Sequence, residues 1–448
     1  MSTGGRAWSN RGVLCGTAIR FALLFLGFGS LVSDRAEIVS PFSSLTRLKE
    51  GVALTEKGLS PYTGSAFHSP PLVLSTLGRL ASFPALISFP LILADLITAV
   101  LLGEIGHTLA IGQDAGEIAS FYLLNPLTIL SCVGGSLGVF ENAFIVLSIY
   151  GAINSKLGLS AFGFCFAAYW GLHPIFLLVP LCVLIYRGGK KDGSNSNNER
   201  ISRYSGLKAV TAFLAFVLIW AISILALSEV SLGIYPEHAC QSWIPWIRGS
   251  FECETGKMGP YETRCSAKHW MVETYWVMLK VDDLTPNIGL FWYFFTEIFS
   301  GFRDFFTFVF HATAGLFLIP VTIRFPDKPL FVIFVQCIIK SLLKPYPTLP
   351  DIALYLGLLP LFPKILGTLQ WWWFLVTSFL FLAIRSPAVW EEWILLGSAN
   401  ANFFYAMNLV FAAWQIILLL MVIDGACKEP AQGKSSSPLV EGSKRKAD

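Results

Sequence analysis

The sequence predicts an all-α, polytopic membrane protein. Only 14% of its 448 residues are charged and 54% are hydrophobic, whereas soluble domains carry about 25% charged residues. The chain also contains 37 Phe and 14 Trp, and its mean hydropathy is +0.62. Because a helix needs roughly 20 apolar residues to cross the hydrocarbon layer, we expect about ten to twelve transmembrane or re-entrant helices in one domain, residues 13–425.

The N-terminal segment is expected to be a signal anchor. Residues 1–12 are polar, and residues 13–32 are apolar and interrupted by Arg20. The apolar run is too long for a typical signal-peptide core, and it lacks a clear small-residue cleavage site. Arg20 either lines a functional cavity or snorkels from near a helix end to the interface, and we favour snorkelling.

A long polar loop, residues 33–71, comes next and includes Asp34 and Glu37. Loops of this length without helical pattern usually carry function. The apolar segment 72–102 that follows contains Asp95. An acid within a span is a functional candidate, and the alternatives are an ion partner on a neighbouring helix or a position at a helix end.

Residues 118–186, beyond a short polar connection at 103–117, consist of interrupted apolar pieces. The interruptions are Asn125-Pro126, Gly134-Gly135 and His173-Pro174. Proline removes a backbone donor and kinks a helix, and non-helical backbone at membrane depth needs protein or a cavity around it. We therefore predict broken or re-entrant helices here.

The most basic internal loop, residues 187–206, sets the expected orientation. By the positive-inside rule it is cytosolic, which also places the N-terminus in the cytosol and the 33–71 loop in the lumen. A span at 207–228 then leads to a luminal segment with a possible insertion, residues 237–270. Its Cys240, Cys253 and Cys265 allow one disulfide in an oxidising lumen and leave one thiol over. Most other cysteines lie in apolar segments, where a free Cys is usually a small hydrophobe.

Further spans are expected in the C-terminal half, near 303–323, 329–343, 351–366, 371–385 and 403–424. Trp371–Trp373 is typical of an interfacial belt. The tail, residues 426–448, is rich in Ser and Lys, and we expect it to be disordered and cytosolic.

One stretch, Asp282–Phe299, combines a polar turn with five consecutive aromatics, Phe291 to Phe295. Aromatic rings favour the headgroup layer, so the block is expected at the luminal membrane surface. A second polar cluster, Gly397–Asn402, leads directly into Phe403, Phe404 and Tyr405.

Both clusters place small polar residues immediately before aromatics. Asparagine amides donate and accept hydrogen bonds, which suits a headgroup rich in hydroxyl and phosphate, and the rings suit acyl chains or a sugar face. The alternative is a helix N-cap followed by an aromatic anchor, with no ligand. The sequence has no phosphate-binding glycine loop, nucleophile elbow or zinc motif, and its net charge of +3 is too small to indicate nucleic acid.

Six blocks give the chain a resemblance to a known family: Glu37–Pro41, Ser60–His68, Phe121–Cys132, Asp283–Phe295, Tyr346–Thr348 and Gly397–Ala406. They resemble the PIG-U family, a membrane subunit of the GPI transamidase complex of the endoplasmic reticulum. The resemblance extends over roughly residues 13 to 425, and the blocks at 283–295 and 397–406 are the most specific.

The resemblance implies a multi-pass protein of the endoplasmic reticulum membrane whose fold resembles the GT-C glycosyltransferases. It implies a non-catalytic subunit, without cofactor or metal, that helps to recognise and present the GPI glycolipid. The chemistry would belong to a caspase-like cysteine protease subunit. The family's glycolipid-contacting asparagines match Asn400 and Asn402, and we expect Asn287, Trp292, Phe403 and Tyr405 to complete the site.

Two departures and two alternatives accompany the resemblance. Residues 237–270 have no recognised counterpart, and the connection before Phe121 looks shortened. The first alternative is a GT-C mannosyltransferase that uses a dolichol-phosphate sugar, with Asp34 or Glu37 as its luminal carboxylate. The second alternative is a channel or transporter, which Asp95 and the proline breaks favour.

Overall fold

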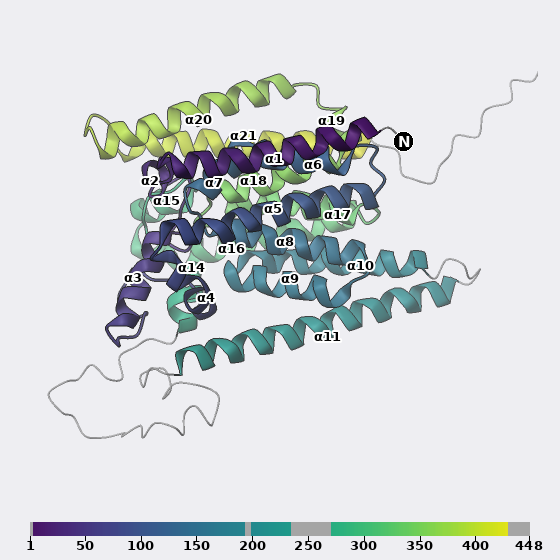
Figure 1. Cartoon of the computed structure of the whole chain (residues 1–448), viewed down its shortest axis with the longest axis horizontal. Helices are drawn as coiled ribbons and strands as arrows, with labels where there is room; N and C mark the ends of the chain where they lie inside the picture. The colour runs from purple at the N-terminus through teal and green to yellow at the C-terminus, as the bar shows by residue number, and fades with distance from the viewer. Residues whose placement is uncertain (1–2, 193–198, 234–269, 429–448) are drawn as a thin grey trace, which may run out of the picture.

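The computed structural model describes residues 3–192, 199–233 and 270–428, and all regular structure in these ranges is helical (Figure 1). The N-terminal half contains α1 (Thr3–Phe25), α2 (Phe28–Val32), α3 (Leu45–Glu56), α4 (Pro71–Ala81), α5 (Pro84–Thr108), α6 (Ala115–Leu124), α7 (Pro126–Val133), α8 (Gly138–Ile153), α9 (Leu157–Trp170), η1 (His173–Leu177), α10 (Leu178–Asp192) and α11 (Glu199–Leu232). The C-terminal half contains η3 (Val272–Trp276), α14 (Val277–Lys280), α15 (Phe291–Glu297), η4 (Ser300–Phe302), α16 (Arg303–Arg324), α17 (Pro329–Leu343), α18 (Leu349–Leu358), η5 (Leu359–Leu361), α19 (Pro363–Leu366), α20 (Trp372–Ile394) and α21 (Ala401–Lys428).

Five described helices, α5, α11, α16, α20 and α21, are long and apolar enough to cross a membrane. The number rises to six if the bent pair of α6 and α7 counts as one span, and six shorter apolar helices pack with them. This confirms the predicted all-α polytopic class. Trp371 immediately precedes α20, Trp372 and Trp373 begin it, and all three side chains are exposed.

The predicted break at Asn125-Pro126 is confirmed, with a bend of 58° between α6 and α7. A residue before proline is driven out of the helical region, and Asn125 is extended, with φ −63° and ψ 123°. Its side-chain oxygen accepts a hydrogen bond from Leu127 N at 2.9 Å, so the residue that ends α6 also caps α7.

The expected snorkelling of Arg20 is wrong. Its side chain is fully buried, and its guanidinium lies 2.8 Å from the carboxylate of Asp95 on α5. The guanidinium also donates to Leu123 O at 2.7 Å and to Thr128 Oγ1 at 3.0 Å. Asp95 therefore has one of the alternative roles considered from the sequence, since it is the ion partner of Arg20 on a neighbouring helix.

The loop 33–71 contains a helix that the sequence pattern did not predict. Ser44 caps α3, accepting from Arg47 N at 3.5 Å, and Leu48 and Val52 bury one side of the helix. The helices α1 and α2 together cover the predicted anchor, but α1 starts at Thr3, inside the segment expected to be a polar terminus.

Three of the five rings of the aromatic block, which was expected at the luminal membrane surface, are covered by other parts of the protein. Phe291, Trp292 and Phe295 are at most 3% exposed and pack inside the protein. The exposed rings on this side of the chain come slightly later, at Phe299, Phe302 and Phe305, which are 81%, 57% and 61% exposed. Other parts of the chain supply the rings that cover the block.

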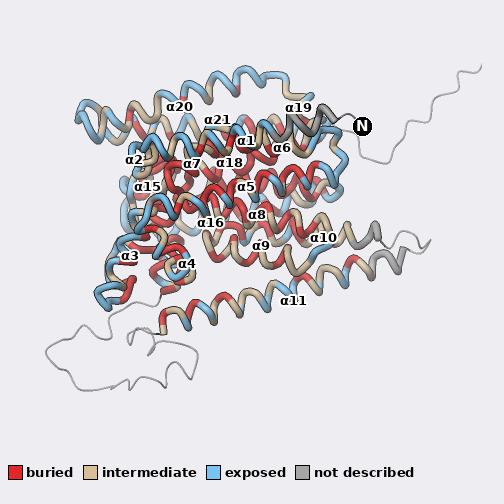
Figure 2. The backbone as a smooth tube through the Cα atoms, viewed as in Figure 1, coloured by how far each residue is buried: buried red, intermediate tan, exposed pale blue. Residues whose placement is uncertain are grey.

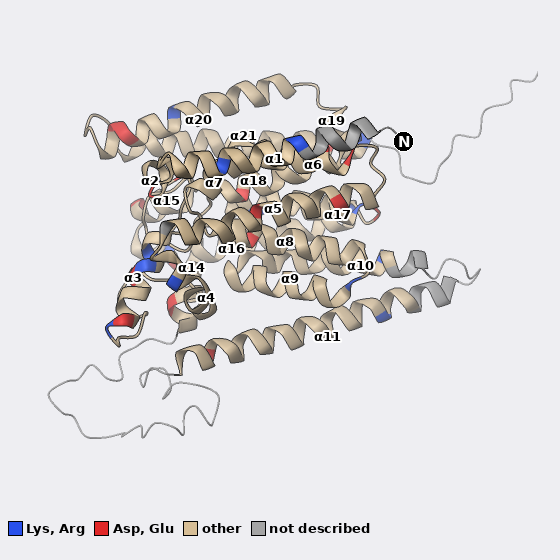
Figure 3. Cartoon of the chain, in the orientation of Figure 1, with Lys and Arg blue, Asp and Glu red and all other residues tan. Residues whose placement is uncertain are grey.

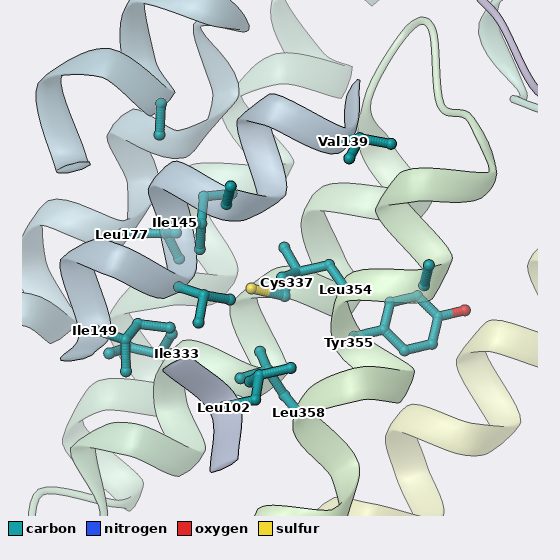
Figure 4. Close-up of a cluster of buried hydrophobic side chains, with 14 of the residues drawn as sticks. Leu102, Val139, Ile145, Ile149, Leu177, Ile333, Cys337, Leu354, Tyr355 and Leu358 are labelled. Carbon is teal, nitrogen blue, oxygen red and sulfur yellow. The ribbon is translucent and has the colours of Figure 1, made fainter. Parts of the chain in front are cut away.

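The most buried helices lie between two peripheral elements. Figure 1 shows α20 and α21 together at one edge and α11 at the opposite edge, with α5, α8, α17 and α18 between them. Figure 2 shows that buried residues concentrate on these central helices. Cys337 packs there among Ile333, Leu354 and Leu358 (Figure 4), as a small hydrophobe.

Several expectations concern segments outside the described residues. These are positions 237–269 of the possible insertion with Cys240, Cys253 and Cys265, positions 193–198 of the basic loop, and positions 429–448 of the tail. In the described part of the insertion, Trp270 is buried and donates to Glu229 Oε1 at 2.8 Å.

Candidate functional site

A tight turn between α20 and α21 presents the two asparagines of the second polar cluster. Gly397 has φ +64°, a conformation that favours glycine. The amides of Ser398 and Ala399 donate to the Glu392 carbonyl at 2.8 and 3.2 Å. Asn400 Oδ1 then accepts from Asn402 N at 3.0 Å and from Phe403 N at 3.3 Å, which caps α21.

Asn402 connects the start of α21 to the aromatic block. The hydroxyl of Tyr293 on α15 donates to Asn402 Oδ1. The ring of Tyr293 lies 4.5 Å from that of Tyr405, centroid to centroid, and the Tyr405 hydroxyl donates to Leu290 O at 3.2 Å. The two sequence clusters predicted separately therefore lie side by side.

Trp292 is a packing residue at this junction. It is 3% exposed, and its ring lies about 6 Å from those of Trp393 and Phe404, on α20 and α21. Phe403, in contrast, is 59% exposed. Trp292 thus fixes the arrangement of three helices, while Phe403 offers an apolar surface beside the exposed Asn400 and Asn402.

Asn287 is also an internal residue. It is 1% exposed, its Oδ1 accepts from Gly289 N at 2.7 Å, and its Nδ2 donates to Thr285 O at 3.2 Å. Asn408 of α21 holds the same turn, donating to Asn287 O at 2.7 Å and to Gly289 O at 3.2 Å. Asn287 therefore shapes the turn before α15, and both polar atoms of its side chain are used within that turn.

We expect Asn408→Leu to loosen the junction of α15 with α21. The change leaves two buried carbonyls without their donor, at a cost of about 1–3 kcal/mol. Gln415→Leu, on the same helix, is the matched control, because Gln415 is similarly buried and its Oε1 has no hydrogen-bond partner among the described residues. Thermal unfolding of the purified protein measures both, and equal melting temperatures for the two variants would contradict the role given to Asn408.

Charged side chains flank the turn on α20. Arg35, from the loop 33–71, donates to Glu391 Oε1 at 2.6 Å and to Pro387 O at 3.2 Å. Arg385 donates with both terminal nitrogens to Glu392, at 2.7 and 3.0 Å. Figure 3 shows that acidic and basic residues are sparse along most of the helices.

A further ion pair ties α3 to the turn before the aromatic block. Arg47 lies 2.8 Å from Asp283, whose carboxylate also accepts from the hydroxyl and amide of Thr285. Partial burial raises the pKa of Asp283, but the bonds from Thr285 and the charge of Arg47 outweigh it and leave the pKa below its usual value. This contact therefore stays ionised at neutral pH and weakens only when the pH falls to that lowered pKa.

A second polar feature lies deeper, where four charged residues meet. Lys340 contacts Glu141 and, at 3.0 Å, Asp351, and Lys344 lies 3.4 and 3.1 Å from the same two acids. Glu141, Lys344 and Asp351 line a cavity with Ser40, Phe42, Trp170 and Tyr346. Because the two lysines and the two acids neutralise each other, we interpret this cluster as a structural contact between helices.

The turn at Asn400 and Asn402 is therefore the candidate site. It combines exposed amides, an exposed aromatic ring and adjoining charges, which suit binding of a polar, amphiphilic molecule. Among the described residues, no three His, Cys, Asp or Glu side chains are grouped so as to hold a metal ion.

Sequence reasoning found the two asparagines but missed their supporting residues, Tyr293, Arg385, Glu392 and Asn408. A signal was present for two of them, since Arg385 and Asn408 are polar residues inside apolar spans. For Tyr293 there was no such signal, because nothing in a run of five aromatic residues indicates which one would bond an asparagine.

Comparison with known proteins gives consistent matches. A family model described as "GPI transamidase subunit PIG-U" matches residues 14–250 and 260–411. The GPI-anchor transamidase component PIGU of Homo sapiens is 31% identical over 432 residues, which covers 90% of this chain and 89% of the relative. The GPI transamidase component GAB1 of Saccharomyces cerevisiae is 29% identical over 400 residues, 88% of each chain.

These matches bear on two expectations. The family model leaves out only residues 251–259 within the segment expected to lack a counterpart. The relatives are named as transamidase components, and these names give no support to the mannosyltransferase alternative.

Proposed function

Because this chain belongs to the PIG-U family and is a multi-pass membrane subunit of GPI transamidase, we propose that its part in the complex is to bind the GPI glycolipid and present it for attachment. The binding site is the turn at Asn400 and Asn402, in the luminal leaflet of the endoplasmic reticulum membrane. A caspase-like cysteine protease subunit of the complex forms the new bond, and this chain is non-catalytic.

The observation that carries the proposal is which hydrogen-bonding atoms of the two side-chain amides are used inside the protein and which remain available. Asn400 uses Oδ1 to cap α21, and Asn402 uses Oδ1 to accept from Tyr293. Both side chains are exposed, and neither Nδ2 has a partner among the described residues. Capping and ligand binding are therefore compatible, since the side-chain carbonyl oxygen of each asparagine accepts a hydrogen bond within the protein and its amide N–H groups stay available to donate to a hydroxyl or phosphate oxygen.

The surroundings support an amphiphilic ligand. Phe403 offers an exposed ring for acyl chains or a sugar face, and Tyr293 and Tyr405 fix the position of Asn402. Trp292 and Asn287 support these residues from inside the protein, through the aromatic cluster and the turn before α15.

We expect Asn400→Ala combined with Asn402→Ala to lower GPI-anchored protein at the cell surface, without disrupting assembly of the complex. The double variant is expressed in cells that lack the endogenous subunit, and surface anchoring and subunit co-purification are measured together. Asn154→Ala is the control, because Asn154 also binds the end of a helix, with Nδ2 3.0 Å from Tyr150 O.

Asn400→Asp separates the two roles of Asn400. Aspartate keeps the oxygen that caps α21 but loses the amide N–H groups. We expect this variant to assemble normally and still to anchor less protein. Normal anchoring by the double alanine variant, in an assembled complex, would overturn the binding role.

A further inference from the structure

Arg385 has an unusual position for a basic residue. It lies well inside α20, nine residues before Ile394. Other basic residues of the candidate spans, Arg303, Arg324 and Lys428, lie at helix ends. A charged side chain at such a position indicates function unless it is buried and paired.

The side chain of Arg385 is paired but not buried. Its two terminal nitrogens bond the Glu392 carboxylate, and the side chain remains 43% exposed. A guanidinium has a second edge, formed by Nε and one terminal nitrogen, that can bind a planar anion bidentately. Nε of Arg385 has no partner in the part of the chain that the structure describes.

Glu392 connects this arginine to the candidate site. Its carboxylate holds the guanidinium, and its carbonyl accepts from the amides of Ser398 and Ala399, just before Asn400. The backbone of Arg385 lies about 13 Å along the helix axis before the C-terminal end of α20, at 1.5 Å per residue. Its side chain extends along the helix toward that end and reaches Glu392. The guanidinium thus lies between the apolar part of α20 and the turn.

The carboxylate of Glu391, next to Glu392, is already paired and does not repel an anion bound at Arg385. Glu391 is bound by Arg35 at 2.6 Å, so each carboxylate at the end of α20 already has its own arginine. Nε–H is therefore the donor left over at the side of α20.

We propose that the free edge of Arg385 binds the phosphodiester of a lipid in the luminal leaflet. This inference rests on the proposed function, because it places the lipid's phosphate beside the turn that would hold the headgroup. The same chemistry has two sources, the glycolipid or a bulk phospholipid of the membrane.

The test is the lipid content of the intact complex. Complexes carrying Arg385→Gln are purified in mild detergent from cells that lack the endogenous subunit. Glycolipid and bulk phospholipid per complex are then counted by mass spectrometry. We expect roughly a tenfold or larger loss of glycolipid, with bulk phospholipid unchanged. Arg187→Gln is the control, because Arg187 is also partly exposed, at 37%, and pairs with an acid, Asp327, through one terminal nitrogen; it should lose neither lipid.

The other outcomes either identify the source of the phosphate or overturn the inference. Loss of bulk phospholipid alone supports phosphate binding and assigns the phosphate to the surrounding membrane. Unchanged amounts of both lipids exclude phosphate binding. If wild type retains glycolipid, the asparagine double variant loses it and Arg385→Gln keeps it, the proposed function survives and only this inference fails.

Arg385→Lys keeps the test valid if the glutamine variant does not assemble. Lysine preserves the charge beside Glu392 but has no second bidentate edge. We expect an assembled complex with reduced glycolipid. Full retention of glycolipid by the lysine variant would overturn the role of the free edge, and failure of both variants to assemble would show a structural role in its place.

Discussion

Lys340→Met is expected to unfold the membrane domain or prevent its accumulation. Lys340 is 2% exposed, and it lies between Glu141 and Asp351, which are 4% and 2% exposed. Removing one partner of a buried ionic group leaves an uncompensated charge, at a cost of about 3–5 kcal/mol. That is a large part of the stability of an ordinary domain, about 5–15 kcal/mol.

The expected size of the effect follows from where the cluster lies. Glu141 is in the first turn of α8, Asp351 is in the first turn of α18, and Lys340 and Lys344 are at the end of α17. Acids at helix N-termini and bases at C-termini complement the helix dipoles. Asp351 Oδ2 also accepts from Thr348 N at 3.0 Å, so one carboxylate caps α18 and joins α17 to it.

The measurement is thermal unfolding of the purified protein in detergent, together with the amount of folded protein recovered. Lys428→Met is the control, since Lys428 pairs with Asp424 but is 54% exposed, and exposed pairs contribute about 0–1 kcal/mol. Combining Lys340→Met with Glu141→Gln removes one charge of each sign and should recover part of the loss. A Lys340→Met variant as stable as Lys428→Met would contradict the account of the cluster.

The same cluster shows why part of the fold could not be predicted from the sequence. Residues 329–343 have the composition of a span, and α17 occupies Pro329–Leu343. Nothing local to Lys340 indicates its partner, because Glu141 is 199 positions away. Spans follow from composition and breaks from proline, as at Asn125-Pro126, whereas pairings between helices depend on long-range packing.

The aromatic block gives the same lesson for the site. Five adjacent rings predict an interface when they are considered alone. In the structure Trp292 packs against Trp393 and Phe404, about a hundred positions later, while Phe291 and Phe294 pack against Phe310. The position of Asn400 at a helix start was predictable, because a Gly-Ser-Ala-Asn turn before an apolar run is typical of a cap. Its neighbour Tyr293 was not, since it comes from another helix.

The second large effect is expected at the ion pair of Arg20 with Asp95. Asp95→Leu alone leaves the guanidinium of Arg20 buried with only neutral acceptors, among them Leu123 O and Thr128 Oγ1. Breaking a buried pair from one side costs about 3–5 kcal/mol. We expect the single variant to destabilise the contact of α1 with α5, α6 and α7, measured as a lower melting temperature and increased proteolysis of α1.

The double variant tests whether the ion pair of Arg20 with Asp95 stabilises the fold more than apolar side chains at the same two positions would. With Arg20→Met and Asp95→Leu together, no charge remains in the apolar contact, and such replacements are often neutral or stabilising by about 1–4 kcal/mol. We therefore expect the double variant to recover most of the melting temperature lost by Asp95→Leu. If it remains as unstable as the single variant, the hydrogen bonds from Arg20 to Gly16 O and Leu123 O, at 2.9 and 2.7 Å, hold α1 in place. In that case the guanidinium acts as a connector of backbones, and the carboxylate of Asp95 serves to keep it charged and oriented.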